Sequence, residues 1–357
     1  MPGPAALRVA VVVLLLAVAH GGAHAQGQDT LDIYYLDVEG GGGTLIVSPS
    51  GSALLIDAGW PGPRDARRIL AAARQAGLAR IDYFLATHFH SDHIGAVSEV
   101  ADALPILNFV DHGEPVEALR GRSAEAYERY LEARAKANHV PVKPGDTLPI
   151  AGVNVRVVAA GGDLLEAPLA GAGAPNPLCG DFTPREGEIA SDAASVGLFI
   201  GFGRFRAVQL GDLTFNEEHD LICPDNVLGT VDVFQMSAHG LNLSSPRELV
   251  HALRPRAVVI NNAGRKGASR AAWQRVQASP GLEDLWQLHY SEQRPGGDQW
   301  AEGAEQGGRD FNVAEQFIAN LDDSTAHYIK MSASDDGSFT ITNGRTGFTK
   351  QYGSRDE

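Results

Sequence analysis

Short apolar runs separated by glycine and polar residues dominate the first part of the chain, and they predict strands. Residues 31–38, 44–47 and 53–56 are rich in Ile, Leu, Val and Tyr, which favour extended structure. The glycines at 40–43 predict a turn between the first two strands. In residues 61–77 the apolar positions follow an i, i+3, i+4, i+7 spacing, which predicts an amphipathic helix that ends at its glycine.

The alternation of strand-like and helical patterns continues along the chain and predicts a mixed α/β domain. Further strands are expected at residues 83–86, 106–110, 153–158, 196–200, 205–210, 231–235 and 254–260. Helical segments are expected at 94–104 and 312–320, a helix-to-strand passage at 279–291, and a closing hairpin at 326–331 and 338–342.

Two segments interrupt this alternation within a domain that we expect to span residues 29–350. At 114–139, aromatic and apolar residues have helical spacing among many charges, which predicts an inserted amphipathic helix packed by one face on the domain. Residues 159–190 form a long connection rich in Gly, Pro and Ala. Connections of this length are usually functional lids or mobile excursions.

Residues 1–25 have the pattern of a signal peptide. Arg8 precedes an apolar run at 9–19, and the small residues at 23–25 suit a cleavage site. We therefore expect an exported chain that begins near Gln26, in the periplasm or outside the cell, without stable membrane insertion after cleavage. An uncleaved membrane anchor is the alternative.

Export changes the interpretation of the two cysteines, Cys179 and Cys223. In an oxidising compartment we expect them to form one disulfide, worth about 4 kcal/mol in the chain-entropy model. The bond would hold the long connection near the active edge of the domain. Two free buried thiols are the alternative.

The charge balance of the chain limits its partners. A formal net charge of −15 at pH 7 over 357 residues argues against a protein that coats nucleic acid or an anionic membrane through its overall field. Any polyanion has to be bound locally, so a small-molecule or phosphoester substrate is expected. The oligomeric state is left open.

The densest cluster of candidate metal ligands lies directly after the predicted strand at 83–86. His88 and His90 fall on one side of a tight turn and can meet one ion, whereas Asp92 and His93 face a second position. Neutral imidazole and carboxylate together suit borderline divalent metals, and catalytic sites keep a coordination position open for water. Two divalent ions are expected, zinc first, with manganese or iron as alternatives. Four polar residues at a solvated loop tip are the other interpretation.

This His-x-His-x-Asp-His motif after an apolar strand resembles the signature of the metallo-β-lactamase superfamily. The resemblance implies an αββα sandwich, in which two mixed sheets carry helices on their outer faces and a metal site lies at one edge. It also implies a metal-dependent hydrolase. Within the superfamily the chain most resembles the hydrolase domain of the DNA-uptake channel protein ComEC. The substrate stays open, because one fold serves many reactions.

The resemblance also assigns roles to residues outside the motif. Asp57, in an Asp-x-Gly turn, is expected to orient a metal ligand, with an ordinary turn residue as the alternative. Asp212, in a Gly-Asp pair after a predicted strand, is expected to bridge the two metals, unless it merely ends the strand. His239 is expected to join Asp92 and His93 at the second metal.

One feature of the superfamily is missing from the sequence. Many members supply a third histidine to the first metal ahead of the strand that precedes Gly-Asp, whereas this chain has Ser191 and Asp192 in that region. The ComEC-like relatives share this absence. Either Asp192 binds the first metal, or that site is incomplete and weak.

A glycine loop with two cations follows the last predicted core strand. Asn262, Arg265 and Lys266 in this loop suit an oxyanion or a phosphate, because backbone N–H groups and point charges converge there. A solvated basic loop is an equal alternative. Further along, His289 either approaches the metals near the missing ligand or, as we favour, is a core histidine.

Together these features predict a secreted hydrolase that uses a metal-bound hydroxide, with Asp212 between the metals and Asp92 orienting the water. The basic loop and the ComEC resemblance favour phosphodiester substrates, as for a nuclease-like enzyme. One alternative is a β-lactamase- or lactonase-type hydrolase of cyclic amides or esters. Another is a non-catalytic metal- or ligand-binding protein.

Overall fold

The computed structural model describes residues 1, 3, 29–292 and 312–355 of the chain. The predicted signal peptide at 1–25 lies almost entirely outside the described residues. Among the described residues, none of the helices is long and apolar enough to cross a membrane.

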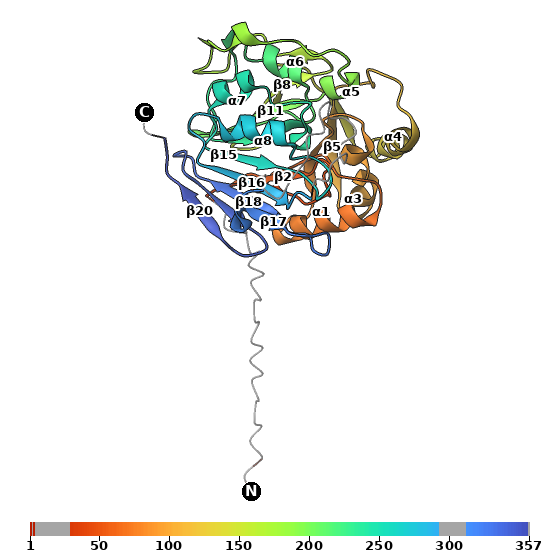
Figure 1. Ribbon diagram of the computed structural model, residues 1–357. Coiled ribbons are helices and arrows are strands. Elements are labelled where there is room, and N and C mark those ends of the chain that lie inside the picture. The colour runs from red at the N-terminus through yellow and green to blue at the C-terminus, as the bar shows by residue number, and fades with distance from the viewer. Residues whose placement is uncertain (2, 4–28, 293–311, 356–357) are drawn as a thin grey trace.

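Two large sheets form the centre of the molecule (Figure 1). The first has nine strands in the order β20-β19-β18-β1-β2-β3-β4-β5-β6. Its strands are β1 (Leu31–Tyr35), β2 (Thr44–Val47), β3 (Ala53–Ile56), β4 (Ile81–Leu85), β5 (Ile106–Asp111), β6 (Asn138–Pro141), β18 (Ile329–Ala333), β19 (Phe339–Asn343) and β20 (Thr349–Tyr352).

The second sheet has the order β17-β16-β15-β14-β12-β11-β8-β7, and β9 also pairs with β8. Its strands are β7 (Thr147–Leu148), β8 (Asn154–Ala160), β9 (Asp163–Leu164), β11 (Gly197–Phe202), β12 (Phe205–Gln209), β14 (Val233–Gln235), β15 (Ala257–Ile260), β16 (Asp284–His289) and β17 (Ile318–Asn320). A separate small sheet joins β10 (Ala174–Pro175) to β13 (Asp225–Asn226).

Helices cover the outer face of each sheet (Figure 1). The first sheet packs against α1 (Pro63–Gln75), α3 (Val97–Ala103) and α4 (Gly121–Arg134). The second packs against α7 (Arg247–Leu253) and α8 (Arg270–Gln277). The remaining helical turns are α2 (Ser91–Ile94), η1 (Cys179–Asp181), α5 (Ala190–Ala193), α6 (Phe215–Asp220), η2 (Ser237–Gly240) and η4 (Glu315–Phe317).

The alternation of side chains along the strands explains the layers. In β3, Leu54 and Ile56 belong to the core between the two sheets, whereas Leu55 belongs to the core beneath α1 and α3. In β15, Val259 faces the other sheet and Val258 faces the helices. Successive residues of a strand point to opposite faces, so strands buried on both faces are continuously apolar. The fold is the predicted αββα sandwich.

The C-terminal hairpin completes the first sheet. Strand β18 pairs antiparallel with β1, so that Met331 lies opposite Ile33. The hairpin of β18 and β19 confirms the prediction, and β20 extends it at the sheet edge. The inserted helix is also confirmed as α4, whose buried residues include Tyr130.

One sequence-based expectation near the C-terminus was wrong, and another was right for its strand but not for its helix. Residues 312–320 contain only the short turn η4, followed by β17. Ile318 pairs with β16 and is buried, so tertiary pairing overrides the local helical pattern. In the 279–291 region the helix α8 has already ended at Gln277, and β16 begins at Asp284.

The parallel strands bring their carboxyl ends to one edge of the sandwich. In the first sheet β3, β4 and β5 are parallel, and in the second sheet β12, β14, β15 and β16 are parallel. Ligand sites in open α/β sheets lie outside the carboxyl ends of such strands. The predicted site residues that follow β3, β4, β12 and β14 therefore meet at this edge.

Cys179 and Cys223 form the predicted disulfide, with their Cα atoms 5.7 Å apart. The bond ties the 159–190 connection to the segment that follows α6. From Cys179 the chain runs through α5, which carries Asp192, and into β11. The disulfide thus fixes one end of the segment that delivers Asp192 to the site edge.

We expect the double variant Cys179→Ala/Cys223→Ala to lose up to about 4 kcal/mol of unfolding free energy, because the bond closes a loop with a sequence separation of 44. Denaturant unfolding under non-reducing conditions measures this loss. Reductant should lower the denaturant midpoint of the wild type and leave the midpoint of the variant unchanged. Equal midpoints for variant and wild type would contradict a stabilising role.

Candidate metal centre

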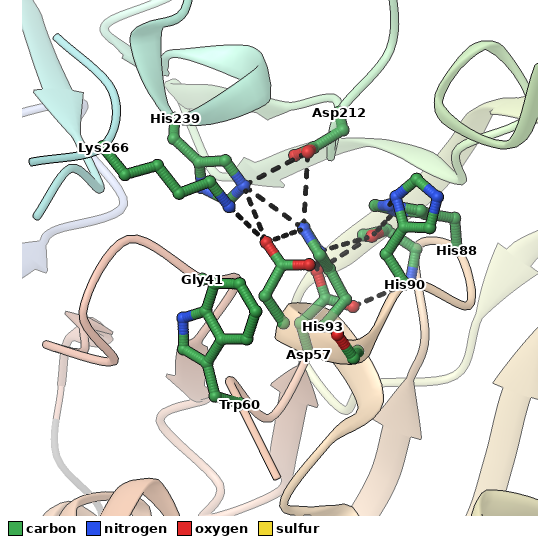
Figure 2. A network of polar contacts seen from close by, with 12 residues as sticks. Gly41, Asp57, Trp60, His88, His90, His93, Asp212, His239 and Lys266 are labelled. Carbon is green, nitrogen blue, oxygen red and sulfur yellow. Dashed lines mark hydrogen bonds and ion pairs between the residues drawn. The ribbon is translucent and has the colours of Figure 1, made fainter. Parts of the chain in front are cut away.

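The histidine motif begins where β4 ends. Leu85 is the last residue of β4, and its carbonyl oxygen accepts a 2.9 Å hydrogen bond from Asp57 N, so the turns after β3 and β4 lie side by side. His88 and His90 extend from the turn after β4, and Asp92 and His93 lie in the short helix α2. Figure 2 shows the side chains of His88, His90 and His93 converging with those of Asp212 and His239 from the second sheet.

One set of three donors lies on the His90 side of the site. His88 Nε2 is 3.0 Å from His90 Nδ1, and Asp192 Oδ1 lies 3.5 Å from the first nitrogen and 3.0 Å from the second. Asp192 Oδ1 is buried and has no well-aligned hydrogen-bond partner among the described residues. A buried carboxylate oxygen without such a partner is costly. Asp192 thus occupies the place where the sequence lacks a histidine.

Four further donors converge on the other side. His93 Nε2 lies 3.3 Å from His239 Nε2. His93 Nε2 is also 3.6 Å from Asp92 Oδ2 and 3.4 Å from Asp212 Oδ2. His239 Nε2 lies 3.5 Å from Asp92 Oδ2 and 3.2 Å from Asp212 Oδ2. Four ligands around zinc at bond lengths of about 2.0–2.2 Å are about 3.4 Å apart in a tetrahedron. These five distances are close to that spacing, and Asp92, His93 and His239 form one group of donors that could hold an ion.

Asp212 lies between the two donor sets. His88, His93 and Asp212 each offer one ligand atom within 4.8 Å of the others. The backbone brings Asp212 here through Gly211, which has φ +61° and no room for a side chain, since a Cβ would lie 2.8 Å from Thr87 Cβ. This close approach of the two sheets requires glycine.

Asp57 fixes the orientation of the histidines, as the resemblance predicts. Its Oδ2 lies 2.8 Å from His93 Nδ1 and accepts a 2.8 Å hydrogen bond from Thr87 Oγ1. Thr87 Oγ1 in turn lies 3.1 Å from His88 Nδ1. The Nδ1 atoms of both rings are thus occupied, which leaves each Nε2 facing the site. Such outer contacts fix the tautomer and direction of a ligand.

The loop that carries His239 has an unusual backbone. Ala238 and His239 adopt φ values of 43° and 56°, a left-handed conformation that costs non-glycine residues about 1–3 kcal/mol each. The conformation is held by hydrogen bonds from Ala268 N to His239 O (3.0 Å) and from Ser269 N to Gly240 O (2.8 Å). Backbone strain of this kind clusters at functional sites.

Charges inside the site shift several pKa values in opposite directions. Burial would raise the pKa of Asp92, but Lys266 and His93 outweigh it and hold that pKa well below its usual range. Burial likewise opposes ionisation of Asp212, yet His239 and His93 lower its pKa well below the usual value. Burial lowers the pKa of His88 well below its usual value. Ionised carboxylates and a neutral imidazole are the forms that bind metals.

The predicted substrate loop is only partly at the site. Lys266 reaches the centre and forms an ion pair with Asp92. Arg265 is exposed and lies 3.6 Å from Glu292. Asn262 is buried, and its side chain donates to His289 O at 2.9 Å. His289 itself contacts Asp37 at 2.6 Å, so it packs in the core, as favoured, and not against the donor sets.

Several further residues support the centre. Thr87 links Asp57 to His88. The Asn261 amide lies 3.2 Å from His239 Nδ1, and Ser191 Oγ lies 2.9 Å from His90 Nε2. Trp60 stands beside Lys266 (Figure 2). The sequence pointed to Ser191 only as the neighbour of Asp192, and to Thr87 only by its adjacency to the motif.

Replacing Asp57 by asparagine should weaken metal binding by about 10- to 100-fold, because the amide cannot accept hydrogen bonds from Thr87 and His93 as both carboxylate oxygens do. Competition with a chromogenic chelator measures the affinity. Asp111→Asn is the matched control, since Asp111 is also fully buried but bonds to Tyr130, Arg134 and His139. An equal loss in both variants would mean general destabilisation instead.

A buried carboxyl group supports the loop that carries His239. Glu218 accepts hydrogen bonds from Ser237 Oγ, at 2.5 Å, and from Ser245 N. Burial raises the pKa of Glu218 to about 8. The folded chain therefore retains a proton that the unfolded chain releases above its ordinary pKa of 4.5.

This proton makes stability depend on pH. Between pH 4.5 and about 8 the folded state binds more protons at Glu218, so the unfolding free energy should fall as pH rises, by at most about 1.4 kcal/mol per pH unit. Glu218→Gln should remove this component of the slope at constant metal content, whereas Glu217→Gln on the same helix should retain it. Parallel slopes in wild type and Glu218→Gln would refute the assignment.

Comparison with known proteins agrees with this centre. Residues 40–174, which include the four donors of the histidine motif, match the family model described as "Metallo-beta-lactamase superfamily". No curated protein matches the sequence. This segment of the chain is therefore similar to that superfamily.

Three solved structures resemble the chain at low identity. They are the metallo-beta-lactamase fold protein YhfI from Bacillus subtilis (9% identity, 72% of this chain and 95% of that chain, TM-score 0.44); Tm1679, a metal-dependent hydrolase of the beta-lactamase superfamily (17%, 72% and 95%, 0.43); and Igni18, a metallo hydrolase from Ignicoccus hospitalis (15%, 72% and 94%, 0.40). At these TM-scores the similarities carry no conclusion about substrate.

Proposed function

We propose that this chain is an exported hydrolase of phosphodiesters that works with two divalent metal ions. The observation that carries the proposal is the pair of donor sets described above. Three donors converge on each side, and Asp212 lies close to His88, His93 and His239.

The residues present fit two metal ions. Imidazole and carboxylate donors suit zinc first, and manganese or iron after it. On this proposal His88, His90 and Asp192 hold one ion, with Asp192 in place of the histidine that the sequence lacks. Asp92, His93 and His239 hold the other, and Asp212 bridges both. The buried Asp192 Oδ1 atom supports this assignment, because it faces the ring nitrogens of His88 and His90 and a cation would balance its charge.

The chain's own residues define the chemistry that the centre can perform. When bound, two divalent ions would supply hydroxide at neutral pH and polarise a phosphoryl oxygen. Asp57 and Thr87 hold His93 and His88 in the orientation for binding, and Asp212 sets the spacing between the two positions. On this proposal the Asp92 carboxylate, which also contacts Lys266, would help to orient a water molecule.

Lys266 supports a negatively charged substrate. Its ammonium group lies at the centre beside Asp92, and its side chain is 30% exposed. A cation in this position would stabilise charge on a phosphoryl group. The net charge of −15 favours a small or locally held substrate over long duplex DNA. The ComEC-like relationship is part of this proposal, since it agrees with the missing histidine.

Export is supported by the disulfide. Disulfides persist in oxidising compartments and are rare in the cytosol. Cys179 and Cys223 are bonded, and these are the two cysteines of the chain. The periplasm or the extracellular space suits this bond, as well as the signal-like sequence at 1–25.

Metal stoichiometry tests the proposal together with hydrolysis of bis(p-nitrophenyl) phosphate. We expect about two ions per chain in the wild type and about one in Asp192→Ala, with activity reduced by at least about 100-fold, because one ion alone cannot provide the two-metal arrangement. Asp163→Ala, an exposed aspartate at the second sheet, serves as the control and should keep both ions.

Each other result has a defined meaning. A single ion in the wild type would refute the two-metal assignment. Two bound ions without phosphodiester turnover, but with hydrolysis of a lactone or a β-lactam, would show that the centre acts on cyclic esters or amides instead. Two ions with no turnover of any of these substrates would favour a metal-binding protein.

A further inference from the structure

The metal centre opens to solvent beside His90, its most exposed donor. The side chain of His90 is 28% exposed, whereas those of Asp92 and Asp212 are 11% exposed and those of His88 and His93 at most 1%. On the other side, next to Asp92, the side chain of Lys266 is 30% exposed. One approach for a substrate to the donor sets is therefore along His90.

A cavity of about 440 Å³ lies at this opening. His90 forms one wall, and the segment 117–123 at the start of the inserted helix forms the other. The segment is joined to the metal-binding loops by two hydrogen bonds. Ser91 N donates to Ser123 Oγ at 3.2 Å, and Ser191 N donates to Glu117 Oε1 at 3.1 Å. The inserted helix is therefore part of the active-site wall.

This wall and the opposite loop bring cations to the opening. Arg120 lines the cavity and is exposed, without an ion pair to any described residue. The Arg122 guanidinium carbon lies 5.3 Å from the centre of the Trp60 ring, and Lys266 Nζ lies 5.1 Å from the same ring. Trp60 is itself held by a 3.1 Å hydrogen bond from Nε1 to Glu39 O.

The lining of the cavity carries one cation, Arg120, and one carboxylate, Glu117. Glu117 accepts the hydrogen bond from Ser191 N, and Lys266 is paired with Asp92. Arg122 lies beside Trp60, outside this lining. One phosphoryl group at the metals leaves Arg120 and Arg122 available for another anion.

We infer that Arg120 and Arg122 determine substrate specificity by binding a second anionic group, in addition to the group that is cleaved. Guanidinium groups bind phosphate and carboxylate by paired, charge-assisted hydrogen bonds. The substrate class is then a phosphodiester with a further phosphate or carboxylate, and the inserted helix is the specificity element. This inference rests on the proposed function only for the cleavage itself.

Two dinucleotides with the same scissile bond test the inference. Thymidylyl-thymidine (TpT) carries only the diester, whereas pTpT adds a terminal phosphate. For the zinc-loaded wild type we expect a higher kcat/KM for pTpT than for TpT. Arg122→Ala should lower the ratio of the two by about tenfold, because it removes one charge-assisted contact, and Arg120→Ala should act in the same direction. Arg122→Lys should retain part of the preference.

Binding provides a readout independent of turnover. Calorimetry should show that thymidine 3′,5′-bisphosphate binds the zinc-loaded protein more tightly than thymidine 5′-phosphate, and that Arg122→Ala reduces the difference by about tenfold. A carboxylate-bearing diester in place of pTpT distinguishes the two kinds of anion. Arg129→Ala, an exposed arginine of the same helix that pairs with Glu99, is the matched control and should leave both ratios unchanged.

The outcomes separate this inference from the proposed function. Turnover of both dinucleotides with a ratio that Arg122→Ala does not change would overturn the inference and leave the hydrolase standing. No turnover, but an Arg122-dependent preference for the bisphosphate, would support the anion site and reject the hydrolase. A parallel loss for both dinucleotides would show that Arg122 only stabilises the wall.

Discussion

The buried carboxylate of Asp57 is the contact on which the centre depends. It sits in a left-handed turn, with φ 59°, directly after β3, and accepts hydrogen bonds from the backbone and the hydroxyl of Thr87 after β4. Through these it fixes the turn from which the histidine motif begins, and it also contacts His93 directly. Gly42 has to be glycine for the same reason, because a Cβ there would lie 2.4 Å from the Asp57 carboxylate. One carboxyl group thus determines the geometry of two strand ends and a neighbouring loop.

The second constraint is the packing of the two sheets. The histidine motif belongs to the first sheet, whereas Asp192, Asp212 and His239 belong to the second, so every donor set combines residues from both. The apolar core between the sheets therefore sets distances between polar atoms at the edge. Protein interiors are close-packed, so a change of one methylene between the sheets would be felt at the donors. The strained backbone at His239 is tolerated because the neighbouring loop at 268–269 holds it from the other side.

The sequence allowed the fold and most of the donors to be predicted, because both depend on local patterns. The alternation in β3 or the spacing within the histidine motif can be recognised from a few adjacent residues. Asp192 could be proposed only as one of two possibilities, since its approach to His88 depends on a connection without a local pattern. The contacts of Thr87 with Asp57 and His88, and the two cations beside the Trp60 ring, could not be predicted. They arise between segments that are far apart in the chain. For the same reason the local pattern at 312–320 predicts a helix, although pairing with β16 makes residues 318–320 a strand.

The disulfide has a consequence that concerns chain cleavage. Asp192 and Asp212 both lie between Cys179 and Cys223, so the carboxylates that the second sheet contributes belong to one covalently closed ring. The positions most open to a protease within that ring are the exposed residues around 183–187. A protease that cut there would produce two polypeptides that remain one molecule, with every donor still attached to its strand. In a compartment rich in proteases, the metal centre would therefore stay assembled after its backbone had been cut.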